Sequence, residues 1–294
     1  STSAASLNRS STFHDRRARR GDSSFVVYFP SGPFAYGVSI AVLAIHLDKN
    51  HIPKLAMGGL AAAFALGIVS FAIPAGWFVQ KFGAKKTLLV ALLGYAACVS
   101  VFRVLTPTSQ LSVARFFDGA CSVNVWVAAE TALLSRSNAT NKAFVMSLYA
   151  MSLAIGYVFG PLLATQVVKF AKTPGTFVAA GVLAVIAAAI VFTRFQSAES
   201  ERHEAEDVAV GTAADGEPAL TVIGVLWRTK TSCFGTFSYG YFQASVVLFL
   251  PLFLIESKSV PEEKTILITA FFALGMLPSS TVVSRLGDRH GHLL

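Results

Sequence analysis

The composition of this 294-residue chain indicates a membrane protein. Apolar residues make up 54% of the chain and charged residues 14%, whereas soluble domains carry about 25% charged residues. The net charge of +8 does not indicate nucleic-acid binding, because the basic residues are scattered between apolar segments. The three cysteines lie in apolar runs without the spacing of a metal site or a disulfide framework. We expect an all-α protein whose partner is the lipid bilayer, with no nucleic acid, metal or cofactor bound.

The chain begins with a polar segment, residues 1–22, which contains a basic run at 16–20. A secretory signal peptide would have an apolar core of about 7–15 residues before a small-residue cleavage site. The apolar run that follows this segment is long enough to span a membrane, which argues against a signal peptide. We expect a disordered cytoplasmic tail that keeps positive charge on the inner side of the membrane.

Eight segments approach the length at which an apolar helix crosses a bilayer, about 20 residues. The fourth segment is the exception in composition, because it carries Arg115, Asp118 and Glu130. In chain order the predicted spans are 23–47, 55–80, 87–102, 108–134, 143–168, 173–193, 231–255 and 265–284.

The connections between spans predict the topology and the division of the chain. Lysine and arginine are concentrated in alternate connections, which places the N-terminus in the cytoplasm of a multi-pass cell or inner-membrane protein. Residues 195–218 are acidic, lack apolar periodicity and predict a solvated cytoplasmic linker. The linker separates a six-helix bundle, 23–194, from a partial second bundle, 219–294, that holds spans seven and eight.

Two glycine-containing basic loops resemble each other, and each follows the second span of its half. This repeat predicts a duplicated six-span unit, so we expect the chain to hold eight of twelve spans and to stop early in the second unit. The first loop contains Gly76, Lys81, Gly83, Lys85 and Lys86, and its copy contains Asp288, Arg289 and Gly291.

Two further motifs lie inside spans. Span four contains the run Arg115-Phe-Phe-Asp118-Gly119, and span five contains Gly156, Gly160 and Pro161. Together with the two loops, these motifs resemble those of the major facilitator superfamily of secondary transporters, in the family's order and on the expected spans. The resemblance covers the chain from about residue 23 to its end, and it implies a 6+6 helical bundle that works by alternating access. Gln80 stands where the first loop motif has aspartate, and Asp118 where the span-four motif usually has glutamine.

The resemblance implies a gating role for the two loops. The basic side chains can pair with carbonyl groups at helix ends or with acids on neighbouring helices, and Glu130 at the inner end of span four is a candidate partner. The alternative is that these lysines only set the topology and contact lipid phosphates.

Arg115 and Asp118 are the candidate proton-coupling residues. A charge in the middle of a span costs about 2.5–3.5 kcal/mol, so it is rarely kept without a partner or a function. The two residues are three positions apart and share one helical face. Asp118 would accept a proton under the influence of Arg115 and burial, although a purely structural ion pair is nearly as well supported.

The small residues of span five, Gly156 and Gly160, predict close helix packing, and Pro161 predicts a kink. A substrate cavity is expected near the membrane midplane between the two halves, and the resemblance implies that spans one, four, seven and ten line it. The expected lining residues are polar or aromatic: Tyr36, Ser39, Asn124, Trp126, Tyr239, Tyr241 and Gln243.

The sequence therefore predicts a monomeric transporter rather than an enzyme, one that exports a small organic solute, neutral or amphipathic, against proton entry. No glycine-rich phosphate loop supports ATP-driven transport. Two alternatives remain, an uncoupled facilitator or uptake permease, and a transport-inactive receptor or scaffold of transporter shape.

Overall fold

The computed structural model describes residues 32–135, 142–195 and 230–275, together with Ser137, Gly224 and Trp227 and without Thr269. The N-terminal half consists of a first helix, 32–49, followed by α2 (Lys54–Phe82), α3 (Ala84–Val101), α4 (Thr108–Leu134) and α5 (Lys142–Arg194). The second half contains α8 (Lys230–Ala244), a π-helical turn (Ser245–Phe249), α9 (Leu250–Lys258) and α10 (Glu262–Ile266). Residues 270–275 are again helical, and the described residues contain no strand.

The helices follow the predicted spans. Four helices in the described part are long and apolar enough to cross a membrane: Lys54–Phe82, Ala84–Val101, Tyr149–Arg194 and Phe237–Lys258. The helix α4, which carries the three charged residues, is not among them, yet it begins and ends where span four was predicted. The all-α membrane bundle is thereby confirmed.

Predicted spans five and six run together as α5. The break between them lies at Lys172, whose φ of 58° and ψ of 176° are non-helical, while the backbone around Pro161 stays helical. The direction of the chain therefore changes eleven residues after Pro161, at the boundary expected from the apolar pattern.

Several predictions fall outside the described residues. These are the tail 1–22, the first part of span one, the acidic linker beyond Phe195, the end of span eight and the second loop copy with Asp288, Arg289 and Gly291. The count of eight spans and the domain boundaries remain predictions.

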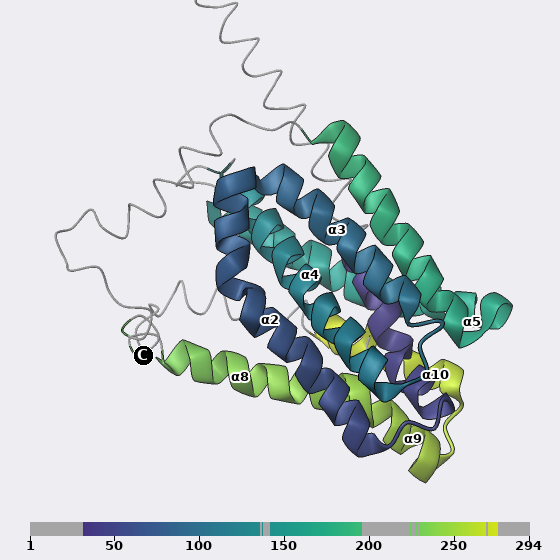
Figure 1. Ribbon diagram of the computed structural model, residues 1–294. Coiled ribbons are helices and arrows are strands. Elements are labelled where there is room, and N and C mark those ends of the chain that lie inside the picture. Colours follow the sequence, from purple (N-terminus) through teal and green to yellow (C-terminus); the bar gives the residue numbers. More distant parts are fainter. Residues whose placement is uncertain are drawn as a thin grey trace, which may run out of the picture.

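The bundle has two ends, which we name after the predicted topology. The outer end holds residues 48–54, 102–107, 169–174 and 256–263, and the inner end holds 82–87, 134–135 and 194–195. Figure 1 shows α9 and α10 at the end where α2 begins, and α8 extending obliquely from that end. One buried cluster joins the first helix to Leu248, Leu252 and Ile266, so the second half packs against the first at the outer end.

Glycines set the closest helix crossings. A Cβ atom on Gly67 of α2 would lie 2.0 Å from the carbonyl oxygen of Phe116, and one on Gly119 of α4 would lie 2.1 Å from that of Phe64. No side chain fits at such distances, so α2 and α4 meet backbone to backbone. The glycine of the span-four motif is therefore required by this crossing.

The span-five glycines make a second crossing, with the first helix. A Cβ atom on Gly160 would lie 2.6 Å from the carbonyl carbon of Gly37, and one on Gly156 would lie 2.3 Å from the Pro33 side chain. The small residues thus permit the close approach predicted for them.

The π-helical turn ends two residues before Pro251. Proline has no backbone N–H, so the carbonyl of Val247 has no donor four residues ahead, and a wider turn accommodates the break. On one side of the turn Leu252 is buried, and on the other Phe234 and Phe237 are exposed.

Candidate functional site

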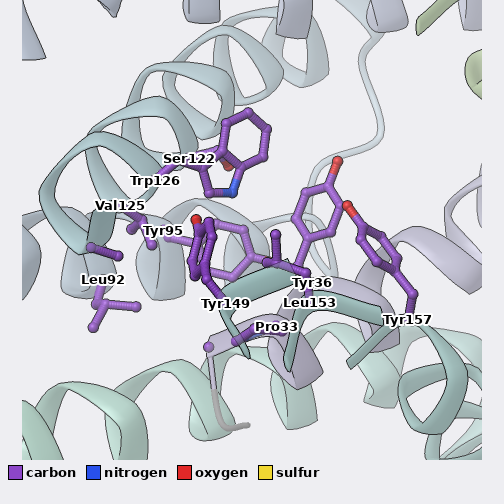
Figure 2. A pocket seen from close by; sticks show the side chains of 12 residues that line it. Pro33, Tyr36, Leu92, Tyr95, Ser122, Val125, Trp126, Tyr149, Leu153 and Tyr157 are labelled. Carbon is purple, nitrogen blue, oxygen red and sulfur yellow. The ribbon is translucent and has the colours of Figure 1, made fainter. Parts of the chain in front are cut away.

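A cavity lies inside the N-terminal half, between the first helix and α3, α4 and α5. It has an empty volume of about 610 Å³, part of which is open to solvent. Figure 2 shows the side chains of Tyr36, Tyr95, Trp126, Tyr149 and Tyr157 arranged around it. The other lining residues are small or aliphatic: Gly32, Pro33, Leu92, Ser122, Val125, Ala129 and Leu153.

Helical periodicity places these residues on common faces. On α5, Tyr149, Leu153 and Tyr157 follow one another at intervals of four, which puts them on one side of the helix. On α4, Ser122 and Trp126 have the same spacing. Each helix therefore contributes one face to the cavity.

Tyr36 connects the aromatic rings. Its ring makes edge contacts with Trp126, at 6.2 Å between centroids and 73° between planes, and with Tyr157, at 5.7 Å and 89°. Such T-shaped pairs are the favoured arrangement of aromatic rings. The first helix, α4 and α5 are thus joined across the cavity.

The charged pair of α4 lies beside Tyr36: Arg115 and Tyr36 line a smaller neighbouring pocket, and neither charged residue lines the aromatic cavity itself. The Arg115 guanidinium donates to Oδ2 of Asp118 in an ion pair, and only 2% of the Asp118 side chain is exposed. The guanidinium also lies 4.2 Å from the centre of the Phe64 ring. The structure thus brings together the two residues predicted for proton coupling.

Several polar atoms on α4 have no hydrogen-bond partner although they are buried: Arg115 Nε, Asp118 Oδ1, Ser122 Oγ and Asn124 Oδ1. Most buried polar groups in proteins are paired, and exceptions often mark functional sites. All of these unpaired atoms belong to α4, so this helix is the one that offers free polar groups inside the bundle.

The predicted lining residues of the N-terminal half have different environments. Tyr36 and Trp126 line the cavity. Ser39 hydrogen-bonds with the Tyr95 hydroxyl at 2.9 Å, next to the cavity. Asn124 donates to the carbonyl of Ala120 in its own helix at 2.7 Å and does not line the cavity.

The predicted residues of α8 are more peripheral. The Gln243 side chain lies near the Tyr157 hydroxyl, which links the second half to the cavity. Tyr241 is 71% exposed and Tyr239 is 41% exposed, and neither lines the cavity.

Sequence analysis missed Tyr95, Tyr149 and Tyr157. A single tyrosine among apolar residues does not interrupt an apolar run, so these residues merged into the predicted spans. The signal that could have found them is the four-residue spacing of Tyr149, Leu153 and Tyr157.

At the inner end, the first loop makes contacts within the N-terminal half. Lys81 lies 4.5 Å from the centre of the Trp77 ring, and Lys85 donates to the Phe195 carbonyl at the end of α5 at 2.5 Å. Lys86 is exposed. Glu130 makes no ion pair with any residue that the structure describes, so its proposed contact with this loop is not formed in this conformation.

The two glycines of this loop differ. Gly83 has a φ of +82° and ends α2, whose last turn bonds to it, and only glycine adopts this region readily. A side chain at Gly76 would meet no atom within 4 Å, so packing alone does not require glycine there.

At the outer end, three ion pairs join the two halves. Lys49 pairs with Glu262 at 2.5 Å, and Lys169 approaches Glu263 at 4.0 Å. The third pair is Lys54 with Glu256. We call these six residues the outer clasp.

Comparison with known proteins supports the motif reading. A family model described as Major Facilitator Superfamily matches residues 24–294. The chain is 25% identical over 282 residues to an uncharacterized MFS-type transporter of Yersinia pseudotuberculosis (serotype O:3, strain YPIII), covering 90% of this chain and 66% of that protein.

Two further relatives are also named MFS-type transporters. An uncharacterized MFS-type transporter of an Enterobacter species (strain 638) is 24% identical, with 88% of this chain and 64% of that protein covered. The uncharacterized MFS-type transporter YcaD of Escherichia fergusonii is 23% identical, with 92% and 68% covered. The chain thus spans about two thirds of the length of these relatives.

Proposed function

Because the chain belongs to the major facilitator superfamily, and is thus a multi-pass membrane transport protein rather than an enzyme, we propose that it exports a small organic solute in exchange for protons. The proposal includes a cytoplasmic N-terminus, a monomer in a cell or inner membrane, and the aromatic cavity as the substrate site. The observation that carries it is the buried Arg115–Asp118 pair, since Arg115 shares a neighbouring pocket with the cavity residue Tyr36.

The coupling step follows from the environment of the pair. When Asp118 is ionised, it neutralises Arg115 within α4. Protonation of Asp118 leaves the Arg115 charge without its partner, and an uncompensated buried charge is strongly unfavourable. The guanidinium must then find another acceptor or water, so proton binding changes the relative stability of the conformational states.

The outer clasp supports alternating access. Its ion pairs cross between the halves and lie at one end only of the described structure. For the substrate site to become accessible from the other side of the membrane, such contacts must break while each half stays intact. The glycine crossings of α2 with α4, and of the first helix with α5, hold the N-terminal half together.

The test is transport by the intact protein in proteoliposomes with an imposed pH gradient. We expect solute movement to follow the gradient, and Asp118→Asn to abolish the gradient dependence while substrate binding persists. The double variant Asp118→Asn with Asn124→Asp is a matched control, because it returns a carboxyl to α4 at another position without restoring the one at position 118. Transport that ignores the gradient, or that Asp118→Asn leaves unchanged, would contradict coupling and favour an uncoupled facilitator.

A transport-inactive receptor would behave differently. Deletion of residues 195–218 would then abolish signalling, and changes at Arg115 would have no effect. Measurable gradient-driven solute flux through the purified protein would contradict that alternative.

A further inference from the structure

The cavity identified above has a lining that indicates the charge of its ligand. Five of its twelve lining residues are aromatic, four tyrosines and one tryptophan, and none is charged. Aromatic rings present negative potential at their faces, which attracts cations and not anions. The lining thus favours a ligand with positive charge or none.

The charges next to the cavity have the same preference. Asp118 lies one helical turn before Ser122, and Glu130 lies one turn after Trp126. The basic group of this region, Arg115, already pairs with Asp118 and covers the Phe64 ring. A cation in the cavity would therefore have both carboxyl groups on the adjoining turns of α4, and none of the twelve residues that line the cavity is basic.

Unpaired acceptors lie along the same helix. Ser122 lines the cavity, is 3% exposed, and its hydroxyl has no partner. Asp118 Oδ1, which can only accept while the carboxyl is ionised, is likewise unpaired and buried. A ligand with an N–H or O–H donor would satisfy such groups, whereas a second acceptor would not.

The size of the cavity limits the apolar part of the ligand. The empty volume of about 610 Å³ includes open solvent, and the enclosed part is much smaller, so the enclosed space lies below the range of about 300–1,000 Å³ for small-molecule sites. The edge contacts of Tyr36 with Trp126 and Tyr157 reduce the free space further. A ligand with one ring is therefore the largest that we expect to enter, and the aromatic side chains of the lining would have to rotate to admit it.

We propose that the cavity binds monovalent organic cations that carry a ring-sized apolar group, with the charge held by the faces of the aromatic rings and by the carboxyl groups of α4. This inference rests on the proposed function for its site, but it concerns binding and requires neither proton coupling nor efflux.

The test is equilibrium binding to the intact purified protein, measured by calorimetry with three probes of nearly equal shape. The probes are phenyltrimethylammonium, its neutral carbon isostere tert-butylbenzene, and the anion benzenesulfonate. We expect the cation to bind at least tenfold more tightly than the neutral isostere, and the anion to show no saturable binding. Equal or tighter binding of either comparison probe would overturn the proposal.

Variants locate the site and test whether it needs an aromatic ring. Trp126→Leu should weaken cation binding at least fivefold, while Trp126→Phe restores most of the affinity because it returns an aromatic face. Trp77→Leu is the matched control, since Trp77 lies on α2 outside the cavity. Thermal unfolding of each variant checks folding, and an unchanged cation affinity in folded Trp126→Leu protein would exclude this cavity as the site.

Failure of this inference differs from failure of the proposed function. If the cation binds but no gradient-driven transport is measured, the binding proposal stands and the transport proposal fails. If transport is measured only with neutral or anionic solutes, the transport proposal stands and the cation proposal fails.

Discussion

The two ends of the bundle use lysine in different ways. At the outer end, Lys49, Lys54 and Lys169 pair with glutamates from the other half of the chain. At the inner end, Lys81 and Lys85 contact an aromatic ring and a backbone carbonyl within their own half. In the alternating-access cycle that we propose, contacts between the halves form and break, whereas contacts within a half persist.

The strength of the contacts fits this division. The clasp residues are about half exposed, and exposed ion pairs contribute only about 0.2–1 kcal/mol each. A set of weak pairs can hold two halves together and still open on a biological timescale. The backbone contacts inside the N-terminal half are of another kind, since they leave no room for an added methyl group.

The largest expected effect comes from disrupting the crossing of α2 and α4 inside the N-terminal half. Gly119→Ala would place a methyl group against the Phe64 carbonyl, and overpacking of this kind costs about 1–3 kcal/mol. We expect a lower unfolding midpoint in denaturant titrations in detergent. Gly59→Ala is the control, because a Cβ there meets no atom within 4 Å, and equal losses in both variants would contradict the crossing.

A smaller effect is expected at the inner end. Lys85→Met removes the hydrogen bond to the Phe195 carbonyl, which at a helix C-terminus is favourable to a cation. We expect a loss of about 1.5 kcal/mol in unfolding free energy, typical of a charged hydrogen bond. The control variant Lys86→Met, at the exposed neighbouring position, should change the unfolding free energy little. Equal losses from the two variants would show that Lys85 contributes only its positive charge and not this hydrogen bond.

The outer clasp should respond to charge reversal. In Lys49→Glu, two like charges would face each other at positions 49 and 262. Spin labels at positions 55 and 258 should therefore move apart, and adding Glu262→Lys should restore the original distance. Each pair is worth about 0.2–1 kcal/mol, so we expect broadened distances rather than unfolding. Lys264→Glu is the control, and a single reversal without effect on the distances would refute a role for this pair in closure.

The smallest effect is that of salt. The Debye length falls from about 10 Å at 0.1 M to about 3 Å at 1 M ionic strength, which weakens exposed pairs. The same spin-label distances should therefore broaden as sodium chloride is raised, by an amount worth a few tenths of a kcal/mol. Distances that do not depend on salt would mean that apolar packing of Leu252 and Ile266, and not charge, holds the outer end.

Much of the fold could be predicted because apolar length is a local property. Residues 108–134 form α4 as expected, since Pro107 precedes the first turn. Arg115 and Asp118 were found because charge inside a span is rare. The tyrosines of α5 were not, because a tyrosine in an apolar run is read as part of the span until the facing helices are known.

The outer clasp could not be predicted for a different reason. Lys54 and Glu256 are separated by 202 positions, and nothing local indicates that their loops meet. Glu130 was expected to pair with the first basic loop because both lie at the inner end in the predicted topology. Side-chain partners, however, also depend on helix rotation and on the conformational state. Pairings between halves are thus the part of such a protein that sequence reasoning reaches last.

The π-helical turn at Ser245–Phe249 changes which way the side chains of span seven face before and after it. Such a turn contains one residue more than an α-helical turn, and one residue corresponds to about 100° of rotation at 3.6 residues per turn. The stretch before the turn can therefore orient Gln243 toward Tyr157 while the stretch after it buries Leu252. Removing a single residue from the turn would rotate one stretch against the other, so that the span could satisfy its contact at the cavity or its contact at the outer end, and not both.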